Sequence, residues 1–150
     1  MISQYIHPKK LNEALEQIAT FKERAKIFAG GTDLIIQMRK GLINPEVVID
    51  ISSLKELRGI NTSQGVVAIG ALTTYYEIIN DPTLIERASV LVQAARAVGA
   101  VQIRSRGTLG GNLGNGSPAG DSIPSLFVLN ADVHLISIEG DRWVPILEFF

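Results

Sequence analysis

Residues 26–41 read KIFAGGTDLIIQMRKG, and this stretch decides the fold of the first third of the chain. Its apolar start, residues 26–29, predicts a short buried strand, and the pair Gly30–Gly31 predicts a turn. A helix is expected from Asp33 to Lys40, with Gly41 just beyond its C-terminal end. A strand, a glycine turn and a helix start therefore follow one another directly.

Further elements flank this unit on both sides. Residues 11–24 place Leu11, Ala14, Leu15, Ile18 and Ala19 at helical spacing. Residues 46–51, EVVIDI, are β-branched and follow Asn44–Pro45, which predicts a second strand. The order helix, strand, helix, strand favours a small α/β unit with a parallel sheet.

The rest of the chain predicts a mixture of helices and strands. Thr74 and Glu77 have the spacing of a capping box, and the helix that they open should stop before Asp81–Pro82. The other expected elements are a helical turn at 54–57, a strand at 65–70, a helix at 84–98 ended by Gly99, a helix at 123–130, a strand at 132–138, a turn at 139–141 and an extended segment at 142–144.

A second glycine-rich segment follows these helices. Residues 107–120 contain six glycines in fourteen positions, and residues 108–121 read TLGGNLGNGSPAGD. We expect a long ordered loop here, and such a loop needs partners for its backbone groups, which a ligand rich in acceptors could supply. Its short polar side chains, Asn112, Asn115, Ser117 and Asp121, suit a sugar or a pyrophosphate. The alternative is a flexible surface linker.

The first glycine turn predicts an anion site. Free backbone N–H groups at a helix start attract phosphate, and glycines let the phosphate approach the backbone closely. Thr32 adds a hydroxyl donor or, alternatively, only caps the helix after a plain β-turn. The turn lacks the G-x-G-x-x-G pattern of a dinucleotide-binding fingerprint.

Composition excludes several functions. The formal net charge of −1, without a block of like charges, predicts no nucleic-acid partner. No run approaches the roughly 20 apolar residues that a membrane span needs, and the N-terminus lacks the pattern of a signal peptide. We therefore expect a cytoplasmic protein that neither enters a membrane nor binds nucleic acid.

The chemistry-bearing residues are few. The chain has no cysteine, which excludes thiolate catalysis and any cysteine-ligated iron–sulfur cluster within it, and only two histidines, which predicts no metal site. Arg104 and Arg106 form a local pair that could meet a phosphate but more simply faces solvent. No catalytic side-chain set stands out, and this silence is typical of a protein whose cofactor performs the reaction.

The sequence resembles a known family in three stretches: FAGGTDLIIQMRKG at 28–41, EVVIDISSLKELRGI at 46–60 and QIRSRGTLGGNLGNGSPAGDSIPSLFVLNADV at 102–133. They resemble the FAD-binding medium subunit of the xanthine dehydrogenase and carbon monoxide dehydrogenase group of molybdenum hydroxylases. The resemblance implies an α+β fold of the PCMH type, similar to vanillyl-alcohol oxidase. A small α/β lobe at about 1–53 would pack beside a lobe with an antiparallel sheet at about 54–150, and FAD would lie between them.

The resemblance also implies which residues bind FAD. The first stretch would surround the diphosphate, and the second would contact the diphosphate, the ribityl chain and the flavin. The implied residues are Phe28, Ala29, Gly30, Gly31, Thr32, Asp33, Leu34 and Ile35 in the first lobe, and Val101, Thr108, Leu109, Gly110, Gly111, Asn112, Asn115 and Asp121 in the second.

The family implies an electron-transfer role. Electrons pass from molybdopterin on a large subunit, through [2Fe–2S] clusters on a small subunit, to FAD and then to NAD or another acceptor. Relatives continue beyond the position of Phe150, so we expect a second lobe that is cut short and no C-terminal family domain. The alternative is a truncated, non-catalytic docking module for an iron–sulfur partner that does not retain FAD.

Overall fold

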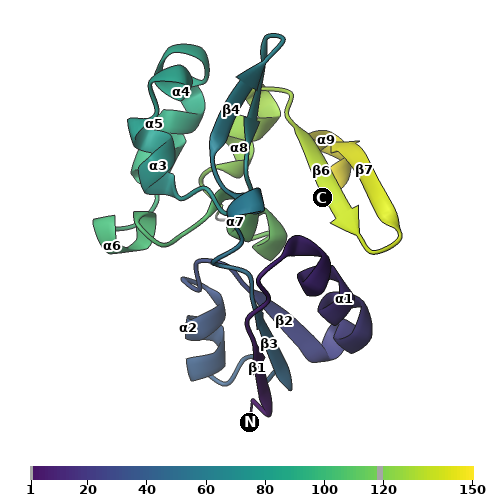
Figure 1. The fold of residues 1–150 in the computed structure, drawn as a ribbon. Helices are drawn as coiled ribbons and strands as arrows, with labels where there is room; N and C mark the ends of the chain where they lie inside the picture. The colour runs from purple at the N-terminus through teal and green to yellow at the C-terminus, as the bar shows by residue number, and fades with distance from the viewer. Residues whose placement is uncertain (1, 118–119) are drawn as a thin grey trace.

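The computed structural model describes residues 2–117 and 120–150, so Pro118 and Ala119 of the predicted glycine-rich loop lie outside the described residues. The chain forms two units, one below the other in Figure 1. The N-terminal unit contains β1 (Gln4–Ile6), α1 (Leu11–Phe21), the 3-10 helix η1 (Lys22–Arg24), β2 (Ala25–Phe28), α2 (Leu34–Arg39) and β3 (Val47–Asp50).

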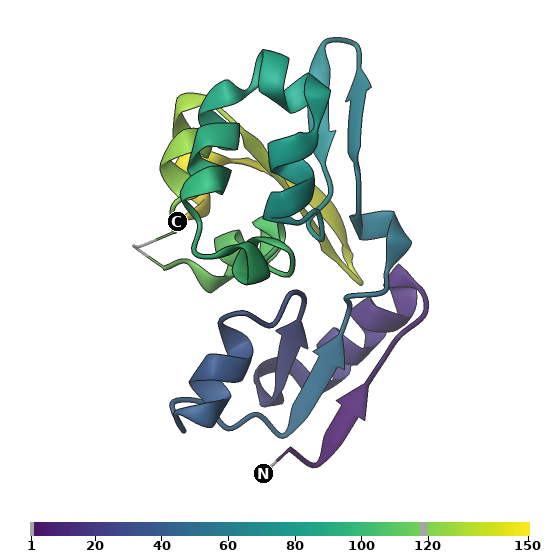
Figure 2. The ribbon, with the colours of Figure 1, turned by 90° about the vertical axis from the view of Figure 1, so that its left-hand side faces the viewer.

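The sheet of the N-terminal unit is parallel, with the strand order β1-β3-β2. The central strand β3 is buried along its whole length, as expected of a parallel strand covered on both faces. Figures 1 and 2 show α1 and α2 on opposite sides of the sheet. The predicted parallel unit is confirmed, but β1 was not predicted, because three half-exposed residues show no hydrophobic pattern.

A buried carboxylate ties β1 to β3. Asp50, at the end of β3, accepts hydrogen bonds from the Tyr5 hydroxyl and from the Ser52 amide, the latter at 2.8 Å. Burial alone would raise the pKa of the Asp50 carboxyl, but the hydrogen bonds from Ser52 and Tyr5, with His7 nearby, together lower it. Asp50 is therefore charged at neutral pH and holds the short edge strand.

The helix after the first glycine turn ends as predicted. Gly41 has φ of 70°, and its amide donates to the Met38 carbonyl, while the amide of Leu42 donates to the Gln37 carbonyl. These two bonds form a Schellman motif, which needs a residue that tolerates a left-handed backbone.

The C-terminal unit combines helices with two separate hairpins. Figure 2 shows β4 and β5 rising beside the helices, and β6 and β7 crossing behind them. Its elements are η2 (Lys55–Leu57), β4 (Ile60–Ser63), β5 (Val66–Ile69), α3 (Tyr75–Asn80), α4 (Pro82–Arg87), α5 (Ser89–Ala97), α6 (Val101–Arg104), α7 (Leu109–Asn115), α8 (Ile123–Val128), β6 (Asp132–Ser137), β7 (Gly140–Pro145) and α9 (Ile146–Phe149).

The core of this unit is formed by helices with both hairpins packed against them. Ile78, Leu84 and Ala95 are fully buried, and Ile60 of β4 and Val133 of β6 pack against the same cluster. Both hairpins are antiparallel. The expected α+β fold, a parallel sheet in one unit and antiparallel strands in the other, is therefore confirmed.

Three expectations about this unit need correction. The helix predicted at 84–98 is two helices, because Asp81 caps a helix that begins with Pro82, and Ala88 leaves the helical region at φ −139° and ψ 44°. The turn expected at 139–141 is shorter, because β7 already begins at Gly140, and the helix α9 follows that strand. The glycine-rich loop is largely the helix α7.

The described residues contain neither a membrane-spanning helix nor a cluster of metal-ligating side chains. No helix among them has the length and apolar character to cross a membrane. No three His, Asp or Glu side chains in residues 2–117 and 120–150 form a group that could hold a metal ion.

Candidate functional site

A cleft of about 830 Å³ lies between the two units, within the 300–1,000 Å³ range of small-molecule and cofactor sites. One wall comes from β2 and α2 and the other from α7 and the segments around it. The cleft is lined by Ala25, Lys26, Ile27, Ala29, Gly30, Gly31, Thr32, Asp33, Leu34, Ile36, Gln37, Ile43, Ile51, Ala71, Leu72, Tyr75, Val98, Ile103, Gly107, Thr108, Gly110, Gly111, Asn112, Gly114 and Asn115.

The first wall is the turn between β2 and α2. Gly31 has φ of 76°, and a Cβ there would overlap the ring of Phe28, so this position requires glycine. The predicted cap is corrected: the N-cap residue is Asp33, in helical conformation, and no side chain caps the helix. With no side-chain oxygen over the helix start, its amides stay open toward the cleft.

These open amides are the main polar feature of the first wall. Within the described residues, the backbone N–H groups of Gly30, Gly31, Thr32, Asp33 and Leu34 meet no protein acceptor. Backbone N–H groups are strong donors that proteins rarely leave unpaired. Five consecutive residues that line the cleft therefore have backbone donors available to a ligand rich in acceptor oxygens.

The second wall uses its amides differently, which corrects the expectation that a ligand partners them. Thr108 caps α7 by accepting a hydrogen bond from the Gly111 amide at 3.1 Å. The amides of Leu109 and Gly110 donate to the carbonyls of Thr73 and Ala71, at 3.0 and 2.9 Å. Protein atoms therefore satisfy the first turn of α7.

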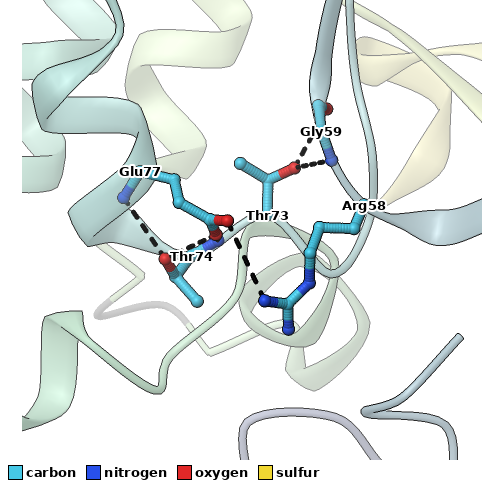
Figure 3. A network of polar contacts seen from close by, with 5 residues as sticks. All are labelled: Arg58, Gly59, Thr73, Thr74 and Glu77. Carbon is cyan, nitrogen blue, oxygen red and sulfur yellow. Dashed lines mark hydrogen bonds and ion pairs between the residues drawn. The ribbon is translucent and has the colours of Figure 1, made fainter. Parts of the chain in front are cut away.

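Residues 71–75 support α7, and hydrogen bonds of Thr73 and Thr74 fix this segment (Figure 3). The buried Thr73 hydroxyl lies 3.1 Å from both the amide and the carbonyl of Gly59. The predicted capping box is confirmed, because Thr74 and Glu77 exchange hydrogen bonds with each other's backbone amides. Glu77 also lies 3.9 Å from Arg58.

The two walls meet at both glycine segments. A Cβ on Gly30 would overlap the carbonyl oxygen of Arg106, so the first turn approaches the second wall to backbone contact. Gln37 of α2 donates to Asn115 of α7 at 3.3 Å, which links the walls a second time. The separation of the walls is therefore fixed by backbone packing as well as by side chains.

A buried chain of hydroxyl groups leads to the cleft. The Ser122 hydroxyl donates to Oδ1 of Asn112 at 2.7 Å and lies 3.1 Å from the Tyr75 hydroxyl. Burial raises the pKa of the Tyr75 phenol to about 12; the hydrogen bond with Ser122 opposes this rise, and the charges of Asp121 and Asp33 add to it. Tyr75 is therefore protonated at neutral pH.

Most of the residues implied by the family line the cleft. Five do not: the Phe28 ring lies beneath Gly31, Leu109 is buried in the core, Val101 is exposed on α6, and Ile35 and Asp121 are exposed outside the lining set. Sequence reasoning missed Gln37, Ala71 and Ile103 as lining residues, because no local motif marks positions that only tertiary packing brings to the cleft.

The Arg104 side chain binds backbone carbonyls instead of facing the cleft, where it could meet a phosphate. Its Nη1 donates to the carbonyls of Arg96, Val98 and Gly99, at 3.4, 3.1 and 2.7 Å. The guanidinium therefore holds the end of α5 beside the cleft wall at Val98.

The whole chain matches a described family. The model for the FAD binding domain in molybdopterin dehydrogenase matches residues 1–150. Among curated proteins, the nicotinate dehydrogenase FAD-subunit of Eubacterium barkeri is 40% identical over 148 residues, which cover 98% of this chain and 50% of that protein. The carbon monoxide dehydrogenase medium chain of Hydrogenophaga pseudoflava is 35% identical, with 98% and 51% covered. The chain thus spans about half the length of these relatives.

Solved structures agree with the family match. A carbon monoxide dehydrogenase from Hydrogenophaga pseudoflava superposes with a TM-score of 0.94 at 34% identity, covering 97% of this chain and 51% of that one. Quinoline 2-oxidoreductase from Pseudomonas putida 86 gives a TM-score of 0.92 at 27% identity, covering 100% and 54%.

Proposed function

We propose that this chain, which belongs to the family of FAD-binding domains in molybdopterin dehydrogenases, holds FAD in the cleft between its two units and takes part in electron transfer. The observation that supports this proposal best is the row of five unpaired amides at Gly30–Leu34. FAD contains a diphosphate, and phosphate oxygens are acceptors that backbone amides bind well.

The donor set of the cleft fits such a nucleotide. The first wall offers backbone N–H groups, and the second offers the Thr108 hydroxyl and the Asn112 side chain. α7 brings no Lys or Arg to the cleft, but Lys26 of β2 lines it, so this side chain and the amides would together attract the diphosphate. Leu72, Val98 and Ile103 add apolar surface that excludes water from the deeper part.

The chain's own residues would bind and orient the cofactor, and the bound FAD would supply the redox chemistry. The chain contains no cysteine, so the [2Fe–2S] clusters that would deliver electrons would lie outside it. We assign those clusters to a small subunit and molybdopterin to a large subunit, and NAD or another acceptor would receive the electrons.

The proposed lobe boundary at residues 53–54 has support from the strand pairing. β3 ends at Asp50, and the next strand, β4, begins at Ile60 and pairs only with β5 in the described sheets. The proposed FAD-binding residues that do not line the cleft, such as Asp121, would have to contact the cofactor from outside the cleft.

The direct test is a titration of the purified chain with FAD, in which quenching of the flavin fluorescence reports binding. We expect saturable binding with a Kd below about 10 µM, equivalent to roughly 7 kcal/mol. Gly31→Ala should weaken it strongly, because φ of 76° and the Phe28 ring leave no room for a methyl group. Gly65→Ala is the matched control, because Gly65 has φ of 83° but lies in the β4–β5 turn with nothing near its Cβ position.

Two outcomes would contradict the proposal. One is a chain that takes up no FAD, either alone or within its whole subunit. The other is an equal effect of the two glycine variants on FAD binding. If the chain took up no FAD but co-purified with a small iron–sulfur subunit, the docking module would be the better account.

A further inference from the structure

The second wall must bind a ligand through side chains, because its helix amides are already used. The first-turn amides of α7 donate to Thr73, Ala71 and Thr108. The polar side chains that α7 brings to the cleft are those of Asn112 and Asn115, and Oδ1 of Asn115 accepts from Gln37. Asn112, which is partly buried where Asn115 is exposed, is the one of the two whose amide is held by a buried hydroxyl, that of Ser122.

The orientation of the Asn112 amide follows from the protons available. Ser122 is fully buried and has one hydroxyl proton, which it donates to Asn112 Oδ1 at 2.7 Å. The Tyr75 hydroxyl lies 3.1 Å from the same Ser122 oxygen, so Tyr75 must be the donor in that pair. The three groups form a chain with one direction, from Tyr75 through Ser122 to Asn112.

This direction determines what Asn112 presents. Its oxygen faces Ser122, so its Nδ2 group, with two N–H donors, is left for the cleft. The buried Gly120 leaves room for this arrangement, since a Cβ there would lie 3.0 Å from Asn112 Oδ1. A reversed amide would donate from Nδ2 to the Ser122 oxygen, and Ser122 would then donate to the Tyr75 oxygen. The buried Tyr75 hydroxyl would be left without an acceptor among the described residues.

We propose that Tyr75 and Ser122 are positioning residues that hold the Asn112 amide with its two donors toward the cleft, where they bind an acceptor oxygen of the flavin nucleotide. This inference rests on the proposed function. It assigns a role to the buried Ser122 hydroxyl, which reaches the cleft through Asn112, and to the hydroxyl of Tyr75, a residue that itself lines the cleft. The second wall would thereby bind acceptor oxygens through the Asn112 side chain, as the first wall would through its backbone amides.

The test measures FAD affinity and stability separately in five variants of the full chain. FAD binding is followed by flavin fluorescence, and stability by the urea midpoint of the FAD-free protein. Asn112→Asp replaces the donors with a carboxylate and should weaken FAD binding about 30-fold or more. Ser122→Ala frees the amide to rotate and should weaken it about tenfold. Tyr75→Phe should weaken it about twofold, because Ser122 can still donate.

The double variant separates positioning from structural support. Ser122→Ala leaves the buried Tyr75 hydroxyl without its partner, so the urea midpoint should fall. Adding Tyr75→Phe removes that orphaned hydroxyl, so the midpoint should recover while FAD binding stays about tenfold weak. Ser125→Ala is the control: this buried serine donates to the Ser122 carbonyl, so its loss should lower the midpoint and leave the FAD Kd within about twofold.

Three results would overturn the inference. FAD binding by Ser122→Ala within twofold of the parent chain would show that Asn112 needs no positioning. Recovery of FAD affinity together with stability in the double variant would show that the hydroxyl chain is only structural. Normal FAD binding by Asn112→Asp would remove the donor role. Each leaves the proposed function standing, because the parent chain binds FAD; a parent chain that binds none overturns both.

Discussion

The two glycine-rich segments that face each other across the cleft use glycine for different purposes. At Gly30–Leu34, five backbone amides are unpaired and open toward the cleft. In α7, the amides of Leu109, Gly110 and Gly111 all have protein acceptors. One segment keeps its backbone for a ligand, and the other uses its backbone to build the wall.

The difference shows what glycine allows in each place. Gly30 lets the first turn touch the Arg106 carbonyl, and Gly31 supplies a left-handed backbone above Phe28. Gly110 instead lets a helix approach residue 71, where a Cβ would come within 2.6 Å of the Ala71 side chain. The two segments are both rich in glycine, but the glycines shape a turn in the first and permit close helix packing in the second.

The largest expected effect is that of Gly30→Ala, which breaks the contact between the two walls. The methyl group would overlap the Arg106 carbonyl, and backbone cannot move aside as a side chain can. We expect the free energy of unfolding to fall by about 3 kcal/mol, at the upper end of typical overpacking costs, together with loss of FAD binding. Urea unfolding and an FAD titration check both, and parent-like stability would show that the walls need not touch.

Gly110→Ala should have the next largest effect, on stability. Alanine in place of a helical glycine normally gains about 1 kcal/mol. Here the methyl group would meet Ala71 backbone atoms at 2.7 and 2.9 Å, so we expect a net loss of about 2 kcal/mol. The urea midpoint of the FAD-free chain measures it, and any gain in stability would contradict the packing role of this glycine.

Thr108→Val tests the cap that satisfies α7. The substitution keeps the shape of the side chain but removes the acceptor of the Gly111 amide. We expect unfolding to become easier by about 1 kcal/mol, the usual effect of losing an N-cap. Thermal or urea unfolding would measure it; an unchanged midpoint would mean that this amide finds another acceptor.

Gly114→Ala should have the smallest effect, with the opposite sign. No atom lies within 4 Å of its Cβ position, although the residue lines the cleft. We expect a gain of about 0.8 kcal/mol in unfolding free energy from helix propensity alone. If FAD binding weakened while stability rose, the open space beside Gly114 would belong to the ligand, which sharpens the contrast with Gly110.

Local patterns were reliable where neighbouring residues alone decide the structure. The strand, turn and helix at 26–41 form where expected, although β2 is partly exposed rather than buried. Gly41 and the Thr74–Glu77 capping box perform their predicted roles. These features depend on backbone conformation and hydrogen bonds within a few residues. The family resemblance, which compares long stretches in register, likewise agreed with the match over residues 1–150.

Patterns failed where distant contacts decide the structure. Three glycines in seven residues predict a loop, because each costs about 1 kcal/mol in a helix. The helix α7 forms nevertheless, because Thr73 and Ala71 accept its first amides and leave no room for side chains at Gly110. The alternative interpretation, in which Thr32 only caps α2, is wrong, because no side chain caps that helix.

The sequence by itself determined the parallel unit, the turn between β6 and β7, the first glycine turn and the family. Only the tertiary structure decided that one glycine segment offers backbone donors while the other offers the Asn112 side chain. The physical reason is that a backbone amide becomes available to a ligand only when no other part of the protein satisfies it. In α7 that condition depends on the carbonyls of Ala71 and Thr73, which lie far from its glycines along the chain.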